Sequence, residues 1–61
     1  SDEKVRQYLS ELMGGASASS LQHYEKVERN RIIKALKDFG ASIRQISRLT
    51  GVSFGIIRKI Q

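Results

Sequence analysis

The sequence contains no cysteine, no proline and no tryptophan, and its 61 residues include one histidine, His23. The absence of cysteine excludes disulfide bridges and cysteine-ligated metal sites. One histidine cannot build a histidine-rich metal site, and no nucleophile with a partnered base is visible in the sequence. We therefore expect no metal or other cofactor, and no enzymatic activity in this segment.

Long apolar runs are also missing. No stretch of about 18 apolar residues occurs, so no segment is expected to span a membrane, and there is no signal-peptide pattern. The chain does not begin with methionine. We interpret it as a segment of a longer protein with a cytoplasmic, nucleoid-associated location. Its length suffices for one small domain, which would bury only about 60% of its unfolded surface.

Acidic residues are scarce in one half of the chain. Residues 1–30 contain four Lys or Arg and five Asp or Glu, whereas residues 31–61 contain seven and one, so the second half carries a net charge of +6. A basic half of this kind suits a polyanionic partner. A charged, solvated surface without such a partner is the alternative interpretation of the charge alone.

Apolar periodicity predicts an all-α domain of four helices, without strands. Residues 1–13 have the pattern of an amphipathic helix that Gly14 and Gly15 stop. The small residues over 14–20 predict a linker. The first helix would then either sit loosely on the rest of the domain or serve another part of the longer protein. A separate domain is expected over 21–61.

The longest apolar pattern predicts a helix over 21–39 that ends before Gly40. Ser19 and Gln22 have the spacing of a capping box at its start. Val27 is expected to widen the apolar face of this helix.

Two short helices are predicted after the long one. Ser42 can cap a helix over 43–50, and Ser53 can cap another that runs from residue 54 to the end. Only three residues separate these helices, and such a turn needs a residue at positive φ, which costs a residue with a Cβ atom about 1 kcal/mol or more. Gly51 fills this position, and Val52 is expected to pack between the two helices.

The stretch over 42–60, SIRQISRLTGVSFGIIRKI, resembles the helix-turn-helix family of DNA-binding domains. The family pattern asks for a small residue in the first helix, a glycine in the turn and apolar residues around them. These places are taken by Ser47, Gly51, Ile46, Val52, Ile57 and Ile60.

The longer run from His23 to Ile60 is similar to the C-terminal DNA-binding domain of bacterial REP-associated transposases and to the Trp-repressor-like domain of bacterial replication initiators. The resemblance implies a basic module that targets a transposase-related protein or a transcription regulator to DNA. The His-x-His and tyrosine machinery of such transposases has no counterpart here, so it implies no nuclease activity.

The resemblance assigns residues 53–59 as the recognition helix, which would enter the major groove. The planar guanidinium of Arg58 suits a bidentate contact with guanine, with a phosphate contact or a solvated side chain as the alternatives. Lys59 suits a phosphate. Phe54 could meet a thymine methyl group or cover the core, and Gly55 could permit close approach or be a tolerated weak point. The predicted DNA-contacting set is Arg44, Gln45, Arg48, Ser53, Phe54, Gly55, Arg58 and Lys59.

Three cations of the long helix, Arg31, Lys34 and Lys37, recur with a spacing that either extends the basic surface or faces solvent. The expected partner is double-stranded DNA. A homodimer is left open, because helix-turn-helix modules often bind as dimers although no leucine repeat enforces pairing here. The alternative function is a helical protein-protein interaction module, with the first helix as docking surface and no direct DNA contact.

Overall fold

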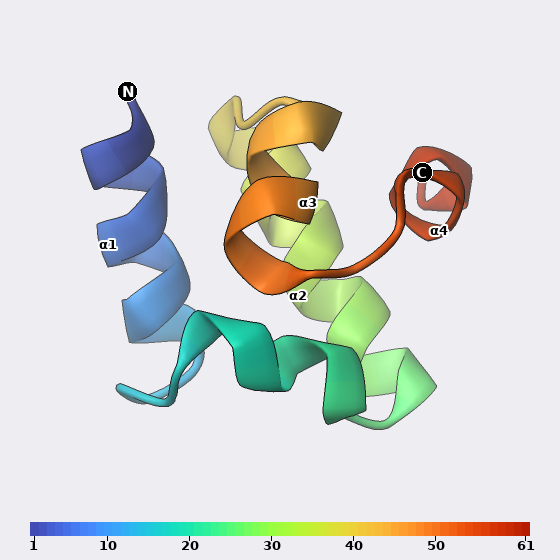
Figure 1. Cartoon of the computed structure of the whole chain (residues 1–61), viewed down its shortest axis with the longest axis horizontal. Helices are drawn as coiled ribbons and strands as arrows, with labels where there is room; N and C mark the ends of the chain where they lie inside the picture. Colours follow the sequence, from blue (N-terminus) through green and yellow to red (C-terminus); the bar gives the residue numbers. More distant parts are fainter.

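The computed structural model describes all 61 residues and contains five helices and no strand, which confirms the predicted all-α class. Figure 1 shows η1 running beneath the other helices, with α1 and α4 at opposite edges. None of the helices combines the length and the apolar character that crossing a bilayer requires. In chain order the helices are α1 (Asp2–Leu12), the 3-10 helix η1 (Ala18–His23), α2 (Lys26–Phe39), α3 (Ile43–Thr50) and α4 (Phe54–Lys59).

A single apolar core joins all five helices. The expectation that the first helix sits loosely is wrong, because Val5 and Leu9 of α1 are only 4% and 1% exposed. Burial of each large apolar side chain contributes about 1.5 to 3 kcal/mol, so α1 is part of the folded unit. The core residues are Val5, Leu9, Met13, Leu21, Ile32, Ile33, Leu36, Ala41, Ile46, Val52 and Ile57.

The segment before α2 differs from the prediction of one helix over 21–39. Ala18–His23 forms a separate 3-10 helix, and Tyr24 and Glu25 are extended, with ψ of 156° and 146°. The cause is Leu21, which is fully buried where η1 packs against α1 and α3. A straight extension of α2 would carry Leu21 away from that contact.

Three finer expectations about this region are also wrong. The linker predicted over 14–20 is shorter, because η1 already begins within it. Ser19 and Gln22 form no capping box, since the Gln22 amide donates to the Ser19 carbonyl oxygen at 3.0 Å. Val27 is 75% exposed, because at about 100° per residue it lies roughly 140° around α2 from the buried Ile32.

The caps predicted for the two short helices are confirmed. The Ser42 hydroxyl accepts from the Gln45 backbone N–H, and the Gln45 side-chain oxygen accepts from the Ser42 backbone N–H, both at 3.0 Å. The Ser53 hydroxyl accepts from the Ile56 N–H at 3.3 Å. The Ser42 cap favours the start of α3 after α2, and the Ser53 cap favours the start of α4 after α3.

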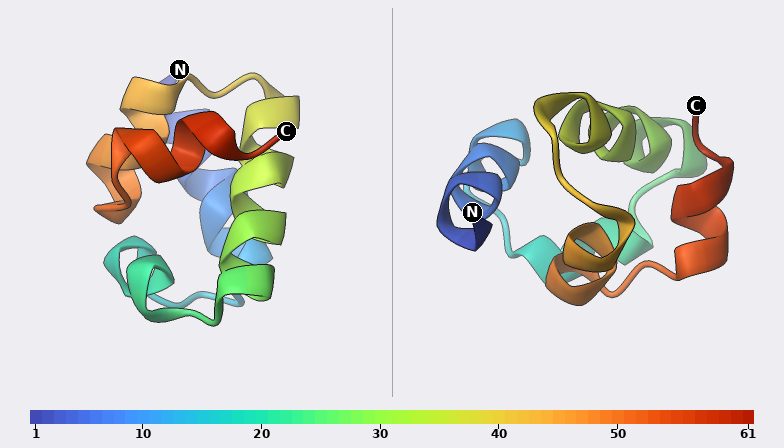
Figure 2. Two further views of the ribbon diagram at one scale, coloured as in Figure 1. Left: turned by 90° about the vertical axis from the view of Figure 1, so that its right-hand side faces the viewer. Right: turned by 90° about the horizontal axis from the view of Figure 1, so that it is seen from above.

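The chain bends between α3 and α4 at Gly51. This residue has a φ of +82°, and its N–H donates to the Ser47 carbonyl oxygen at 2.8 Å. In Figure 1, α3 is seen from the side and α4 nearly end-on, and Figure 2 shows α4 lying across the direction of α2. The positive φ predicted for the turn is therefore present.

A buried hydroxyl holds this bend in place. Thr50 is fully buried, and its Oγ1 donates to the Ile46 carbonyl oxygen at 2.7 Å. The same oxygen accepts from the Val52 N–H at 3.1 Å. Val52 is only 3% exposed, so it packs between the helices as predicted.

We expect Gly51→Val to destabilise the domain by about 1 to 2 kcal/mol or more, because a β-branched residue resists positive φ. An added Cβ would also lie 2.8 Å from the Gln22 side-chain nitrogen, which must then move. Urea denaturation followed by circular dichroism measures the change.

Gly55→Ala is the matched control for this substitution. Gly55 lies in α4 with open space around its Cβ position and without positive φ, so alanine should stabilise the protein by about 0.5 to 1 kcal/mol. Equal stability of wild type and Gly51→Val would contradict the assigned role of the turn.

Candidate nucleic-acid interface

Four of the eight residues predicted to contact DNA lie on α4. Ile57 is fully buried, and at about 100° per residue Gly55 and Lys59 lie on the opposite side of the helix, with Arg58 on one flank. Arg58 and Lys59 are exposed and have no ion pair or hydrogen bond within the protein. Phe54 is 44% exposed, so part of its ring is open to a ligand.

Ser53 stands exposed at the start of α4. Its hydroxyl oxygen accepts from the Ile56 N–H, which leaves the hydroxyl proton free to donate. Ser53 can therefore cap α4 and bind an external acceptor, such as a phosphate oxygen, at the same time.

Lys37 of α2 anchors the end of α4. Its ammonium group donates to the Ile57 carbonyl oxygen at 3.1 Å and also to the Ile60 carbonyl oxygen. The Ile57 carbonyl oxygen also accepts from the Ile60 N–H at 3.2 Å, and the negative end of the helix dipole favours a cation. Lys37 is thus a positioning residue for α4, a role the sequence analysis missed.

The predicted contact residues of α3 differ in whether they have a partner within the protein. Arg44 is exposed and has no partner. Gln45 is half-buried, and its amide nitrogen donates to the Asp2 carboxylate at 2.9 Å while its amide oxygen serves the Ser42 cap. Arg48 forms an ion pair with the same carboxylate. Arg44 is therefore available to a ligand, whereas Gln45 and Arg48 are engaged in hydrogen bonds or an ion pair within the protein.

These contacts change the protonation of Asp2. The pKa of Asp2 lies below its ordinary value chiefly because Gln45 donates a hydrogen bond to the carboxylate. The guanidinium of Arg48 acts in the same direction, and partial desolvation opposes both. The first turn of α1 is thereby tied to the exposed side of α3.

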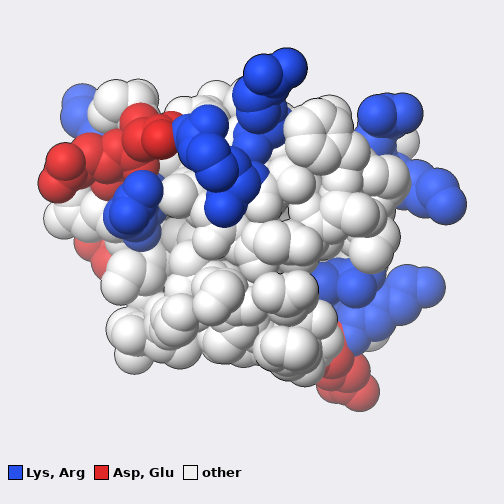
Figure 3. Space-filling model, in the orientation of Figure 1, with Lys and Arg blue, Asp and Glu red and all other residues white.

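The predicted row of cations on α2 does not extend the basic surface. Arg31 pairs with Glu28 and Lys34 pairs with Asp38 on the same helix, while Lys37 points to the end of α4. Figure 3 shows the resulting distribution: basic side chains stand over α3 and α4, whereas acidic and basic side chains lie side by side over α1 and at the start of α2.

Two cations that the sequence analysis did not single out lie beside α4. Lys26 and Arg29, from the first turn of α2, line one cleft together with Lys59. Their i, i+3 spacing is visible in the sequence, but it has meaning only once the helix is known to begin at Lys26. No group of three or more acidic or histidine side chains in the structure could hold a metal ion.

Comparisons with protein-family models, with curated proteins and with solved structures find no match to this chain. Its function is therefore inferred from the geometry and charge of its own residues.

We expect Lys37→Met to loosen the last turn of α4 and to cost about 1.5 to 3 kcal/mol, the range for hydrogen bonds that involve a charged group. Amide exchange of Ile57 and Ile60, measured by NMR, should become faster. Lys34→Met removes the same charge, but its exposed ion pair contributes about 1 kcal/mol at most. Equal effects of the two substitutions would contradict the anchoring role.

We expect the Asp2 contacts to stabilise the fold only where the carboxylate is charged. Because its pKa is lowered in the folded state, the stabilisation is present above the ordinary pKa of about 3.9 and is lost as the pH falls through the lower folded value. Asp2→Asn should therefore lower the melting temperature at pH 6, and the difference from wild type should shrink below about pH 4.

Glu3→Gln controls for the Asp2 experiment, because Glu3 lies in the same first turn of α1 without a bond to α3. It shares the favourable interaction with the positive helix end but not the contact with Gln45 and Arg48. A difference between wild type and Asp2→Asn that is independent of pH would contradict the electrostatic explanation.

Proposed function

We propose that the chain is a double-stranded DNA-binding module, a helix-turn-helix of Trp-repressor-like arrangement in which α4 is the recognition helix. The observation that carries this proposal is the outward side of α4, where Arg58 and Lys59 stand without internal partners on a helix that lies across the bundle. A helix about 10 to 12 Å wide fits the major groove, which is about 12 Å wide.

The side chains around α4 divide into two roles. Arg58 presents a planar fork of donors that suits the O6 and N7 atoms of guanine, so it reads sequence. Lys59, Ser53 and Arg44 are suited to phosphates, which fix the position of the protein on the duplex without reading bases. Gly55 adds no side chain beside Lys59, which permits a close approach of the helix to the groove.

Asp2 weakens the contribution of α3 to this surface. Gln45 and Arg48 can bind phosphate only if they give up the Asp2 carboxylate, because one set of donors cannot satisfy two anions fully. In a longer protein the module would direct a transposase-related enzyme or a transcription regulator to its DNA site. Its binding strength then rests mainly on Arg44, Arg58 and Lys59.

We expect fluorescence anisotropy to show binding to a labelled duplex selected from a random pool, with an affinity that falls steeply from about 50 to 200 mM salt. Arg58→Ala should cost about 1 to 3 kcal/mol and relax the preference at one base pair. Lys59→Ala should weaken binding to all duplexes by a similar factor, because it removes a phosphate contact.

Lys4→Ala is the control for these substitutions, since Lys4 is an exposed cation of α1, on the far edge of the molecule from α4. It should change DNA affinity little. Absence of duplex binding at low salt, with the helical circular dichroism spectrum intact, would overturn the DNA-binding proposal. That result would favour the protein-protein interaction module instead.

A further inference from the structure

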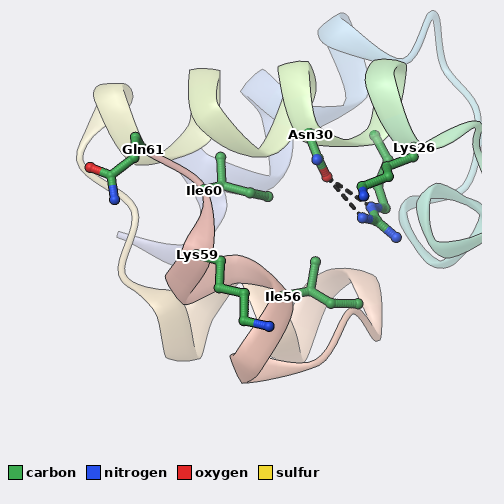
Figure 4. Close-up of a pocket in the computed structure, with 7 residues that line it drawn as sticks. Lys26, Asn30, Ile56, Lys59, Ile60 and Gln61 are labelled. Carbon is green, nitrogen blue, oxygen red and sulfur yellow. Dashed lines mark hydrogen bonds between the residues drawn. The ribbon is translucent and has the colours of Figure 1, made fainter.

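A cleft of about 560 Å³ separates α4 from the start of α2. This volume lies within the range of about 300 to 1,000 Å³ that ligand sites occupy. Figure 4 shows Lys26 and Asn30 on one wall, Ile56 and Lys59 on the other, and Ile60 between them. The lining contains three cations, from Lys26, Arg29 and Lys59, and no acidic side chain.

The cations of this cleft lack acidic partners, unlike most of their neighbours on α2. Lys26 and Lys59 make no hydrogen bond or ion pair within the protein, and the Arg29 guanidinium donates to the neutral Asn30 side-chain oxygen at 3.0 and 2.9 Å. One turn further along, Arg31 and Lys34 both pair with carboxylates. Of the cations on α2, only Lys26 and Arg29 are therefore engaged neither by a carboxylate nor by the carbonyl groups at the end of α4.

The apolar part of the lining indicates that the anion carries apolar groups beside its negative charge. Ile56 and Ile60 are half-buried and line the cleft together with the cations. A free inorganic anion would leave these carbons without a contact. A sugar-phosphate backbone offers both features, because its anionic oxygens alternate with the apolar carbons of deoxyribose.

The position of the cleft fits the same ligand as α4. In Figure 1, α4 occupies the right-hand edge, between the start of α3 above and the start of α2 below. A helix in a major groove has a phosphate backbone on each side, so the elements that flank it meet one backbone each. Arg44 belongs to the first turn of α3, on one side of α4, and the cleft lies on the other side.

We propose that the cleft binds the DNA backbone on one side of the groove that α4 enters, with Lys26, Arg29 and Lys59 contacting successive phosphates. This inference rests on the proposed DNA-binding function and adds two residues to its interface. Lys26 and Arg29 position the protein and read no base, so they contribute equally to every sequence.

The test compares two double variants of the same helix and the same charge change. Lys26→Gln/Arg29→Gln removes the cations of the cleft, and Arg31→Gln/Lys34→Gln removes two paired cations. Affinity is measured by anisotropy against salt concentration, with a labelled duplex selected from a random pool and a scrambled duplex of equal composition. Circular dichroism checks that each variant is folded.

The cleft variant should lose roughly tenfold or more in affinity at about 0.1 M salt, equally for both duplexes, and its slope of log affinity against log salt should fall by about 1.8, or 0.9 per phosphate contact. The control variant should keep the wild-type slope. Lys26→Gln alone, which leaves the Arg29–Asn30 hydrogen bonds intact, should lower the slope by about 0.9.

The contrary results distinguish failure of the cleft inference from failure of the DNA-binding proposal. Equal changes in the two double variants would overturn the inference, since long-range charge would then explain the loss. An unchanged slope in the cleft variant, with Arg58→Ala still weakening binding, would overturn the inference and leave the DNA-binding function standing. A folded wild type that binds neither duplex would overturn both.

Discussion

The direction of α4 depends on one backbone dihedral angle, the φ of +82° at Gly51. A residue with a Cβ atom resists this conformation, and an unbroken helix through the position would continue along the axis of α3. The buried Thr50 hydroxyl bridges the end of α3 to the Val52 N–H, so the bend is also fixed by hydrogen bonds that water cannot replace. With the bend in place, Ile57 reaches the core and Arg58 faces solvent.

A helix as short as α4 needs support from outside itself, because isolated helices of this length are not stable in water. Ser53 caps its start, Ile57 anchors its middle in the core, and Lys37 binds two carbonyl groups at its end. The three contacts restrain both ends and one side of the helix. Its remaining side is left without internal partners, and this is the side that the proposed function uses.

The sequence predicted the local features well and the long-range features less well. The caps at Ser42 and Ser53 and the positive φ at Gly51 depend on neighbouring residues, so their signals are local. The break at Tyr24 depends on the burial of Leu21 against α1 and α3, which no local pattern reveals. The ties of Asp2 to Gln45 and of Lys37 to Ile57 join residues 43 and 20 positions apart, and only the folded chain shows them.

The same distinction explains why a row of cations in the sequence is a poor guide to a binding surface. Counted by charge, the second half of the chain holds most of the basic residues, yet four of its seven are engaged within the protein. Arg31, Lys34 and Arg48 pair with carboxylates, and Lys37 binds helix carbonyl groups. Lys26 and Arg29 belong to the half with a net negative charge and are nevertheless unpaired by acids. An anion binds to cations that have no partner within the protein. The fold, rather than the composition, determines which cations these are.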